Sequence, residues 1–338
     1  MASERDFTWR DGERTVVFRD GLFADAPDLL DRSIWGRFEL LTTPRALGAA
    51  SVELAECSSA VHQVPGGPVP DAAAALIDSV RNPTLVALGG GRVIDTAKAI
   101  AAVRGGKVCA MPTTLSGAEM TTIHRLPAGR ESQASHLVRP SLVIADPIEM
   151  TTFDEHRLRA SAMNALAHGA EALYGPLANP VATLLGLRGA ELIARALDQE
   201  PGERDRVALA LGSLLSAHAL DSAGFALHHV VCQTLVRVLE IPHAETNATM
   251  LPRTMAAMRS RAPEAIGSLA TALGTTPGRI QSRVQSLSGG RRRLRDLDPD
   301  PERLEAAVNA ILSRPDLAAN TPDPPDRGEL KALLERAW

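Results

Sequence analysis

Residues 85–100, LVALGGGRVIDTAKAI, decide how the N-terminal half of this chain folds. A short apolar run typical of a buried strand comes first, three glycines follow, and an alanine-rich helical segment comes next. Gly89, Gly90 and Gly91 can adopt backbone angles closed to other residues and let a phosphate approach the main chain. The N-terminus of the following helix would supply oriented N–H groups. The run therefore predicts a strand, a turn and a helix that can hold a pyrophosphate.

The glycine triplet by itself leaves two interpretations open. Many strand-to-helix turns use glycine only so that neighbouring segments can pack closely. The spacing also differs from the GxGxxG pattern, which indicates that this is not an ordinary Rossmann reductase. A phosphate site and a packing turn are both compatible with this segment alone.

Four further runs in the first 150 residues have the same strand pattern. They are RTVVF at 14–18, FELLTT at 38–43, KVCAMPTT at 107–114 and PSLVIADP at 140–147. Short apolar strands that alternate with helical segments are typical of βαβ units in a parallel sheet. We therefore predict a doubly wound α/β domain over residues 1–150.

The character of the sequence changes near residue 150. Segments rich in alanine and leucine then dominate, and strand patterns almost vanish. These segments span 155–174, 180–198, 203–222, 244–258, 263–273, 302–312 and 328–337. The change predicts a second, all-α domain over residues 151–338. One continuous α/β domain with additional helices is the alternative.

The composition is that of a globular protein long enough for two domains. The chain has 338 residues, 45% of them hydrophobic and 22% charged, and a net charge of −4. This acidic balance argues against nucleic acid or a membrane surface as a partner, because both attract basic proteins. The 3 cysteines lack CxxC spacing, which argues against a disulfide framework. The expected location is therefore the reducing cytoplasm. The polar N-terminus and the lack of a membrane-length apolar run favour the same location.

The segment 286–302, SLSGGRRRLRDLDPDPE, contains consecutive arginines. It is rich in turn residues, and it mixes charges of both signs. We therefore expect a solvated connection there and not a phosphate-binding patch.

A group of imidazoles lies in the predicted helical domain. Asn164 and His168 are four positions apart, so they share one face of a helix. His229 lies on another helical segment, and His243 follows a proline turn. His228 should point away from the group and serve in packing or orientation. A lone histidine is usually structural, so the prediction of a site depends on the set.

These motifs resemble those of the iron-containing alcohol dehydrogenases. GGGRVIDTAK at 89–98 is similar to the family's GGGSxxDxAK, with Arg92 in place of serine and with Asp95 and Lys98 retained. MPTTLSGAEMT at 111–121 is similar to PTTxxxGSE. The resemblance implies a dehydroquinate synthase-like fold, in which a dinucleotide-binding domain precedes an all-helical substrate domain.

The resemblance also implies a nicotinamide cofactor. LLTTPRA at 40–46 matches the TPR motif of the maleylacetate reductases, a branch of the family. A nearby arginine tolerates the 2′-phosphate of NADP(H), whereas an acidic residue would prefer the ribose of NAD(H), so both cofactors stay open. The residues assigned to the cofactor are Thr42, Pro44, Arg45, Gly89, Gly90, Gly91, Asp95, Thr113 and Thr114.

In the family, Asp-x3-His and two later histidines fourteen positions apart hold a divalent ion. The same spacing here makes His168, His229 and His243 tentative ligands of iron or zinc. Asn164 replaces the anionic ligand. The maleylacetate reductases resemble this chain in having that asparagine, within SGMNAxAHxxEALY, and the resemblance implies that a catalytic metal is not required. A metal is therefore compatible with the site but not favoured. The imidazoles would then polarise a carboxylate-bearing substrate by charged hydrogen bonds.

The chain departs from the family pattern at Gln233. The family usually carries a histidine there, in HHxxCH, which relays a proton near the nicotinamide. Glutamine donates and accepts hydrogen bonds but does not titrate near neutral pH. Leu115 and Ala118 replace more polar residues of the family. Val236 and Arg237 replace a Gly-Gly, and their larger side chains would narrow the cleft in which the family binds its substrate.

The resemblance covers nearly the whole chain. It implies an NAD(P)H-dependent reductase of a small unsaturated oxo-acid, which converts maleylacetate to 3-oxoadipate in the catabolism of aromatic compounds. The alternative is a recruited scaffold for a non-redox step (elimination, decarboxylation or isomerisation) or a catalytically impaired binding subunit. A cytoplasmic homodimer with a small carboxylate substrate, and without nucleic-acid or membrane partners, is expected. The implied catalytic residues are Asn164, His168, His229, Gln233 and His243.

Overall fold

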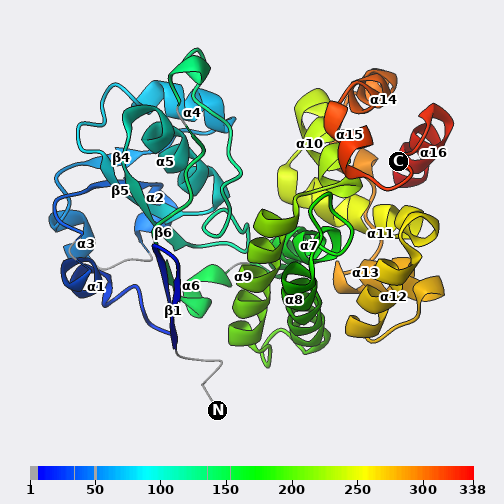
Figure 1. Ribbon diagram of the computed structural model, residues 1–338, viewed down its shortest axis with the longest axis horizontal. Helices are drawn as coiled ribbons and strands as arrows, with labels where there is room; N and C mark the ends of the chain where they lie inside the picture. The colour runs from blue at the N-terminus through cyan, green and yellow to red at the C-terminus, as the bar shows by residue number, and fades with distance from the viewer. Residues whose placement is uncertain (1–6, 34, 49–51, 135, 153) are drawn as a thin grey trace. The chain divides into compact units, whose positions relative to one another are not determined.

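The computed structural model describes residues 7–33, 35–48, 52–134, 136–152 and 154–338. The first six residues, which are part of the polar N-terminus noted above, lie outside the described residues. The chain divides into two compact units, Met1–Thr152 and Phe153–Trp338. The first unit, blue to green in Figure 1, contains a sheet and helices, and the regular structure described in the second, green to red, is helical.

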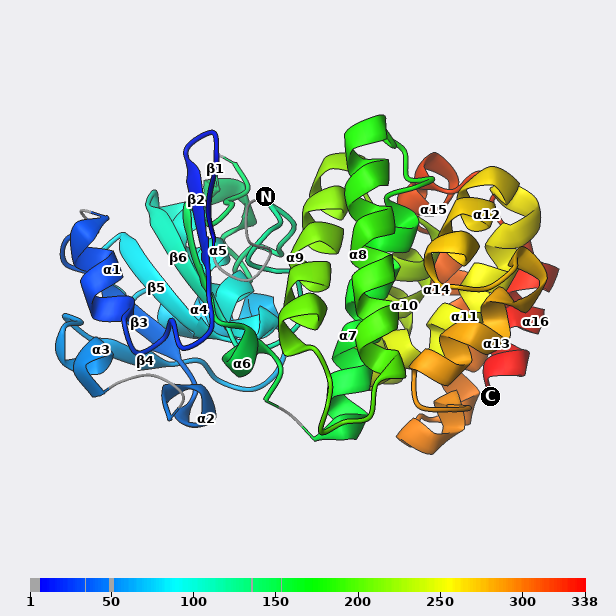
Figure 2. The same cartoon turned by 90° about the horizontal axis from the view of Figure 1, so that it is seen from below.

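A seven-stranded sheet forms the core of the first unit among its described residues, in the order β1-β2-β7-β6-β5-β3-β4 (Figure 2). All neighbouring strands are parallel except β1, which pairs antiparallel with β2. The doubly wound α/β prediction is confirmed, with an antiparallel edge strand that was not predicted. The strands are β1 (Phe7–Asp11), β2 (Arg14–Phe18), β3 (Glu39–Thr42), β4 (Val61–Gln63), β5 (Thr84–Gly89), β6 (Lys107–Pro112) and β7 (Leu142–Ala145).

Helices cover both faces of the sheet, so the central strands are buried on both sides. Successive side chains of a strand point to opposite faces. Ala87 of β5 therefore packs in a cluster with α4 and α5, whereas Val86 packs in another with α1 and α3. The helices of this unit are α1 (Ala26–Arg32), α2 (Pro44–Leu47), α3 (Val52–Glu56), α4 (Val69–Leu76), α5 (Gly91–Arg104) and α6 (Pro147–Met150).

The winding of the sheet reverses between β3 and β5. These strands are parallel neighbours, although the chain passes from β3 out to β4 before it returns to β5. In open α/β sheets, ligands bind at the carboxyl ends of the strands where the winding reverses. Thr42 ends β3 and Gly89 ends β5, so both residues lie at this edge.

The predicted segments of the second unit correspond to α7, α8, α9, α11, α12, α14 and α16. Capping residues start several of them: Asn179 precedes α8 and accepts from Ala182 N, and Asp326 with Glu329 forms a capping box at α16. The helices are α7 (Glu155–Glu171), α8 (Pro180–Asp198), α9 (Arg206–Ala223), α10 (Leu227–Leu239), α11 (His243–Arg261), α12 (Pro263–Ala272), α13 (Ile280–Leu287), α14 (Leu304–Leu312), α15 (Pro315–Asn320) and α16 (Arg327–Ala337).

Glycine allows α7, α8 and α9 to pack with their backbones close together, and both views show the three side by side (Figures 1 and 2). A Cβ at Gly189 of α8 would lie 2.8 Å from the carbonyl oxygen of Gly212 on α9. A Cβ at Gly169 of α7 would lie 2.9 Å from the carbonyl oxygen of Gly186. Small residues thus take the place of aromatic ones in this core. Within the described residues, no single helix has the length and hydropathy of a membrane span; α9 and α10 reach them only as a pair bent by 99°.

Candidate active site

The glycine turn after β5 contacts the loop after β6 closely. A Cβ at Gly90 would lie 2.9 Å from Cγ2 of Thr114, and one at Gly91 would lie 2.9 Å from Cβ of Ser116. Such separations are too short for real Cβ atoms, so packing alone requires glycine at both positions. Close packing therefore accounts for these glycines, and a phosphate site needs a further observation to support it.

The start of α5 supplies that support. Gly90 is its N-cap, and no side chain caps its first turn. A helix N-terminus without a capping side chain can receive phosphate oxygens on its N–H groups. Thr113 donates its N–H to the carbonyl of Gly89 at 3.0 Å, which joins the two loops at the edge where Thr42 ends its strand. The glycine turn and the open helix start together fit the pyrophosphate of a dinucleotide.

Lys98 joins α5 to the loop after β6. Its buried Nζ donates to Oδ1 of Asp95 at 2.8 Å and to the carbonyls of Ala118 and Ile123 at 3.0 and 2.9 Å. A buried ammonium needs such partners, because desolvation of an unpaired charge is costly. Asp95, which we predicted to face the cofactor, therefore neutralises a lysine that holds the loop after β6 in place.

The TPR motif lies at the carboxyl end of β3. Thr42 is buried there, Pro44 is the first residue of α2, and Thr43 accepts from Ala46 N as the cap of that helix. Arg45 is exposed and donates to the carbonyl of Thr152 at 3.3 Å. The structure thus brings this motif and the glycine turn to one edge of the sheet, where the sequence predicted the cofactor.

In the second unit, the structure brings Asn164, His168 and His229 together. Asn164 and His168 lie one turn apart on α7, and Nδ2 of the asparagine is 3.4 Å from Nε2 of His168. The ring of His229 on α10 stacks on the ring of His168, with centroids 4.9 Å apart and 16° between the planes. All three side chains are buried.

His243 and Gln233 complete the predicted set. His243 is the exposed first residue of α11, and its charge lowers the pKa of both His168 and His229. Gln233 lies one turn after His229 on α10, and its Oε1 accepts from Nη1 of Arg314 at 3.1 Å. Arg314, which precedes α15, is a partner that the sequence analysis did not predict.

Glu171 is a further residue of this site that the sequence analysis did not assign. It is buried at the end of α7, and its Oε2 lies 2.5 Å from Nδ1 of His229. Its Oε1 accepts the backbone N–H of His228 at 2.6 Å. These contacts attach α10 to α7 and leave Nε2 of His229 without a hydrogen-bond partner in the described chain. Its position three residues after His168, on the same helical face, was the signal that could have identified it.

Burial makes the imidazoles of this site neutral. Desolvation, reinforced by His243, lowers the pKa of His229 to about 3. Desolvation, together with electrostatic repulsion between the protonated forms of the neighbouring imidazoles, lowers the pKa of His168 well below its ordinary value. Burial raises the pKa of Glu171. In the free site, burial therefore opposes the charged form of these imidazoles, because each charged form would lose its hydration.

The donor set as placed does not fit a divalent ion. A metal lies in the plane of each imidazole that binds it, but the ring planes of His168 and His229 run nearly parallel. One ion therefore cannot lie in the planes of both stacked rings. Asn164 supplies no negative charge, and no group of three His, Cys, Asp or Glu residues in the described ranges is arranged to hold an ion.

His228 packs edge-on against His229, with ring centroids 5.2 Å apart, and both of its ring nitrogens contact side chains of α11. Its Nδ1 lies 2.9 Å from Oγ1 of Thr254, and its Nε2 lies 2.8 Å from Oδ1 of Asn247. The amide of Asn247 in turn donates to the carbonyl of His243 at 2.8 Å. These contacts agree with the orienting role expected from its position, since they tie α10 to the first turn of α11.

The fold is that of the iron-containing alcohol dehydrogenases. The model of that family matches residues 14–147, and the model of its C-terminal part matches 159–338. The chain belongs to this family of NAD(P)-dependent oxidoreductases.

Its relatives include several maleylacetate reductases. The enzyme of Pseudomonas knackmussii is 32% identical over 338 residues, which cover 96% of this chain and 95% of that protein. Maleylacetate reductase 1 of Rhodococcus opacus is 34% identical, with 80% of this chain and 77% of that protein covered. The crystal structure of maleylacetate reductase from Agrobacterium tumefaciens superposes with a TM-score of 0.83 at 28% identity, and the match covers 100% of this chain and 99% of that one.

Proposed function

We propose that this chain is an NAD(P)H-dependent reductase that converts maleylacetate to 3-oxoadipate. The observation that carries the proposal is the 32% identity with the Pseudomonas knackmussii maleylacetate reductase across 96% of this chain. Residues 1–150 would hold the cofactor at the glycine turn, and residues 151–338 would hold the substrate. Arg45 at the sheet edge is compatible with NADPH as well as NADH.

The reduced nicotinamide, when bound, supplies a hydride to one carbon of the substrate's carbon–carbon double bond. The electron pair of that bond moves toward the neighbouring carbonyl, so an enolate develops and needs hydrogen-bond donors. Nδ2 of Asn164 and an N–H of the neutral His168 ring are such donors. Protonation of the neighbouring carbon then completes the reduction.

Delivery of that proton does not involve Gln233, because an amide does not titrate near neutral pH. Glu171 and His229 share a proton across a contact of 2.5 Å. With the proton on the carboxyl group, Nε2 of His229 carries an N–H and can donate it to the enolate. Water would then restore the pair after the product leaves.

We also propose a biological setting for the enzyme. We place the enzyme in the cytoplasm as a homodimer, with a small carboxylate substrate from aromatic-compound catabolism and no nucleic-acid or membrane partner. Size-exclusion chromatography with light scattering tests the dimer directly. A monomer at micromolar concentration would contradict that part of the proposal and leave the reaction untouched.

An assay of NADH and NADPH oxidation with maleylacetate tests the reaction. We expect turnover with at least one cofactor and 3-oxoadipate as the product. Calorimetry of cofactor binding separates the two ways in which the assay can fail. Cofactor binding without turnover would favour the recruited non-redox scaffold, and no binding of either cofactor would favour an impaired binding subunit.

A further inference from the structure

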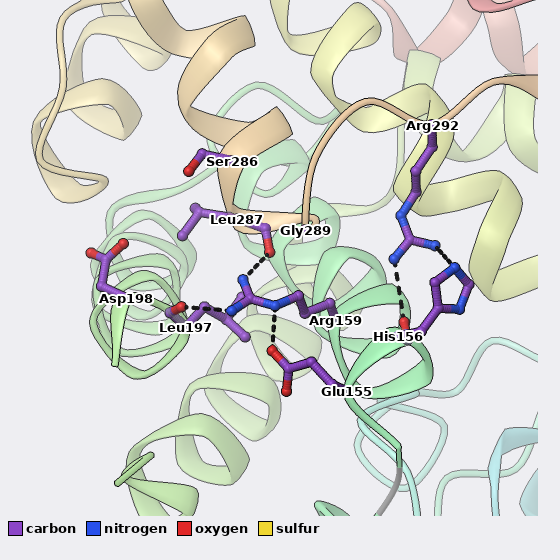
Figure 3. Close-up of a pocket in the computed structure, with 9 residues that line it drawn as sticks. All are labelled: Glu155, His156, Arg159, Leu197, Asp198, Ser286, Leu287, Gly289 and Arg292. Atoms are coloured by element: carbon purple, nitrogen blue, oxygen red, sulfur yellow. Dashed lines mark hydrogen bonds and ion pairs between the residues drawn. The ribbon is translucent and has the colours of Figure 1, made fainter. Parts of the chain in front are cut away.

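A cavity of about 550 Å³ lies within the second unit, between the start of α7, the end of α8 and the loop that follows α13 (Figure 3). Cavities of this size accept small organic ligands. Arg159, which lines it, precedes His168 by about two and a half turns on α7. The cavity is therefore separate from the stacked imidazoles, and the proposed reaction does not use it.

Arg159 is held rigidly in this cavity. Its Nε donates to Glu155 at 2.5 Å, its Nη1 to the carbonyl of Leu287 at 2.9 Å, and its Nη2 to the carbonyl of Leu197 at 3.2 Å. Gly289, with a φ of +83°, passes so close that a Cβ there would lie 3.1 Å from Cδ of Arg159. Both the backbone angle and the close approach favour glycine, so the loop is shaped around this arginine.

Arg292 lies on the other side of the cavity and is bonded to an imidazole and two backbone carbonyls. Its Nη1 lies 2.7 Å from Nε2 of His156, and its Nη2 and Nε donate to the carbonyls of His156 and Ser288 at 3.3 and 3.0 Å. Since an arginine only donates, Nε2 of His156 is the acceptor in this contact. Burial, opposed by Glu245 and reinforced by the charge of Arg159, lowers the pKa of Arg292. The two guanidinium groups thus repel each other.

The carboxylates of the cavity are already neutralised. Arg204 donates to both oxygens of Glu155 at 2.5 and 2.9 Å. Arg283 donates to both oxygens of Asp198 at 2.7 and 2.6 Å. Glu245 also acts on Arg292, so three carboxylates face four guanidinium groups, counting Arg159 and Arg292, and one positive charge remains uncompensated.

We propose that this cavity binds a small dianion, carrying either a phosphate group or two carboxylates, between Arg159 and Arg292. Guanidinium groups bind such oxygens through paired hydrogen bonds, and the ligand would relieve the repulsion between the two arginines. The site does not depend on the proposed reductase activity. It also changes the interpretation of the segment 286–302, which was expected to be only a solvated connection.

Isothermal titration calorimetry of the full chain at constant ionic strength tests the site, with inorganic phosphate, succinate and acetate as probes. We expect one dianion to bind per chain, and acetate to bind at least tenfold more weakly. Arg292→Gln should weaken dianion binding at least tenfold, and Arg292→Lys should weaken it less. Arg206→Gln removes an exposed arginine of α9 outside the cavity and should leave binding unchanged. Saturation by phosphate alone or by succinate alone supports the site and identifies the ligand class.

A second control separates this cavity from the proposed substrate site. Dianion binding should persist in His243→Ala, because His243 does not line the cavity. Three results would overturn the proposal: no saturable binding of either dianion, equal losses in Arg292→Gln and Arg206→Gln, or loss of binding in His243→Ala. Thermal unfolding of each variant shows that the comparison is made between folded proteins.

Discussion

Oε2 of Glu171 lies 2.5 Å from Nδ1 of His229, and 58 positions of sequence separate the two residues. The contact orients the imidazole, determines which of its nitrogens faces the site, and joins the end of α7 to the start of α10. Glu171 is a positioning residue, because it acts through His229. Glu171 also shares a proton with His229. This matters because Gln233 stands where the family usually has a titrating histidine.

Glu171→Gln should lower kcat for maleylacetate reduction by about 10²-fold, the order that a positioned acid or base contributes. The amide keeps the volume of the carboxylate but cannot exchange a proton with Nδ1 of His229. Steady-state kinetics should show an unchanged KM for the cofactor, since the glycine turn is untouched. Glu191→Gln, which removes a carboxylate near the middle of α8, serves as the control. A kcat within about twofold of wild type would disprove the positioning role.

Gln233→His should introduce a pH-dependent step into the reaction. Nη1 of Arg314 lies 3.1 Å from Oε1 of Gln233, and Nε and Nη2 of the same guanidinium group donate to Asp316. A histidine at position 233 would face the guanidinium side of this ion pair. A like charge lowers the pKa of an imidazole, and the inflection in the pH profile of kcat should lie below about 6.5. Adding Arg314→Gln should move the inflection upward. An inflection that does not respond to Arg314→Gln would contradict the contact.

Gly90→Ala should weaken cofactor binding by about tenfold or more, which corresponds to about 1.4 kcal/mol. The added Cβ would lie 2.9 Å from Cγ2 of Thr114 and force the loop after β6 away from the turn. Adding Thr114→Ala removes that methyl group and should restore part of the affinity. Gly66→Ala, where a Cβ meets nothing within 4 Å, is the matched control in a fluorescence titration with NADH. Equal effects at the two glycines would exclude this steric explanation.

Glu119 should make stability depend on pH. Burial, opposed mainly by its backbone hydrogen bond and by Lys98, raises the pKa of this carboxyl group from 4.5 to about 7. A folded-state pKa above the unfolded value gives stability that is complete below the unfolded pKa and is lost as the pH rises to about 7. The loss amounts to about 3 kcal/mol between these values.

Urea unfolding from pH 5 to pH 8 measures this dependence. Glu119→Gln imitates the protonated acid, so its unfolding midpoint should vary less with pH and should exceed that of wild type at pH 8. The exposed Glu131→Gln is the control and should behave as wild type. If Glu119→Gln kept the pH dependence of wild type, another group would be responsible.

A metal chelator should not change kcat. One ion cannot lie in the planes of both stacked rings, those of His168 and His229, and Asn164 adds no charge to hold a cation. We expect the same kcat with and without a chelator, and no gain on addition of zinc or iron. Activity that is lost with chelator and restored by either metal would show that the rings reorganise around an ion.

The local pattern predicted the strands of the sheet unevenly. β5 and β6 combine long apolar runs with clear turn residues, and they were predicted within two residues of their ends. β4 has only three residues, and β1 is a short polar edge strand, so neither offers a pattern long enough to recognise. In the second unit, α13 was not predicted, because its 8 residues are also too few to form a clear pattern.

The sequence by itself determined the doubly wound sheet, the glycine turn and the helical second unit, because each depends on residues that are near neighbours along the chain. It also placed Asn164 and His168 on one helical face, since helix geometry alone decides that spacing. Only the tertiary structure decided that Glu171 meets His229 and that Arg292 faces Arg159 across a cavity. These contacts join helices distant in sequence, and the close glycine packing between helices, which local periodicity does not encode, determines which side chains meet.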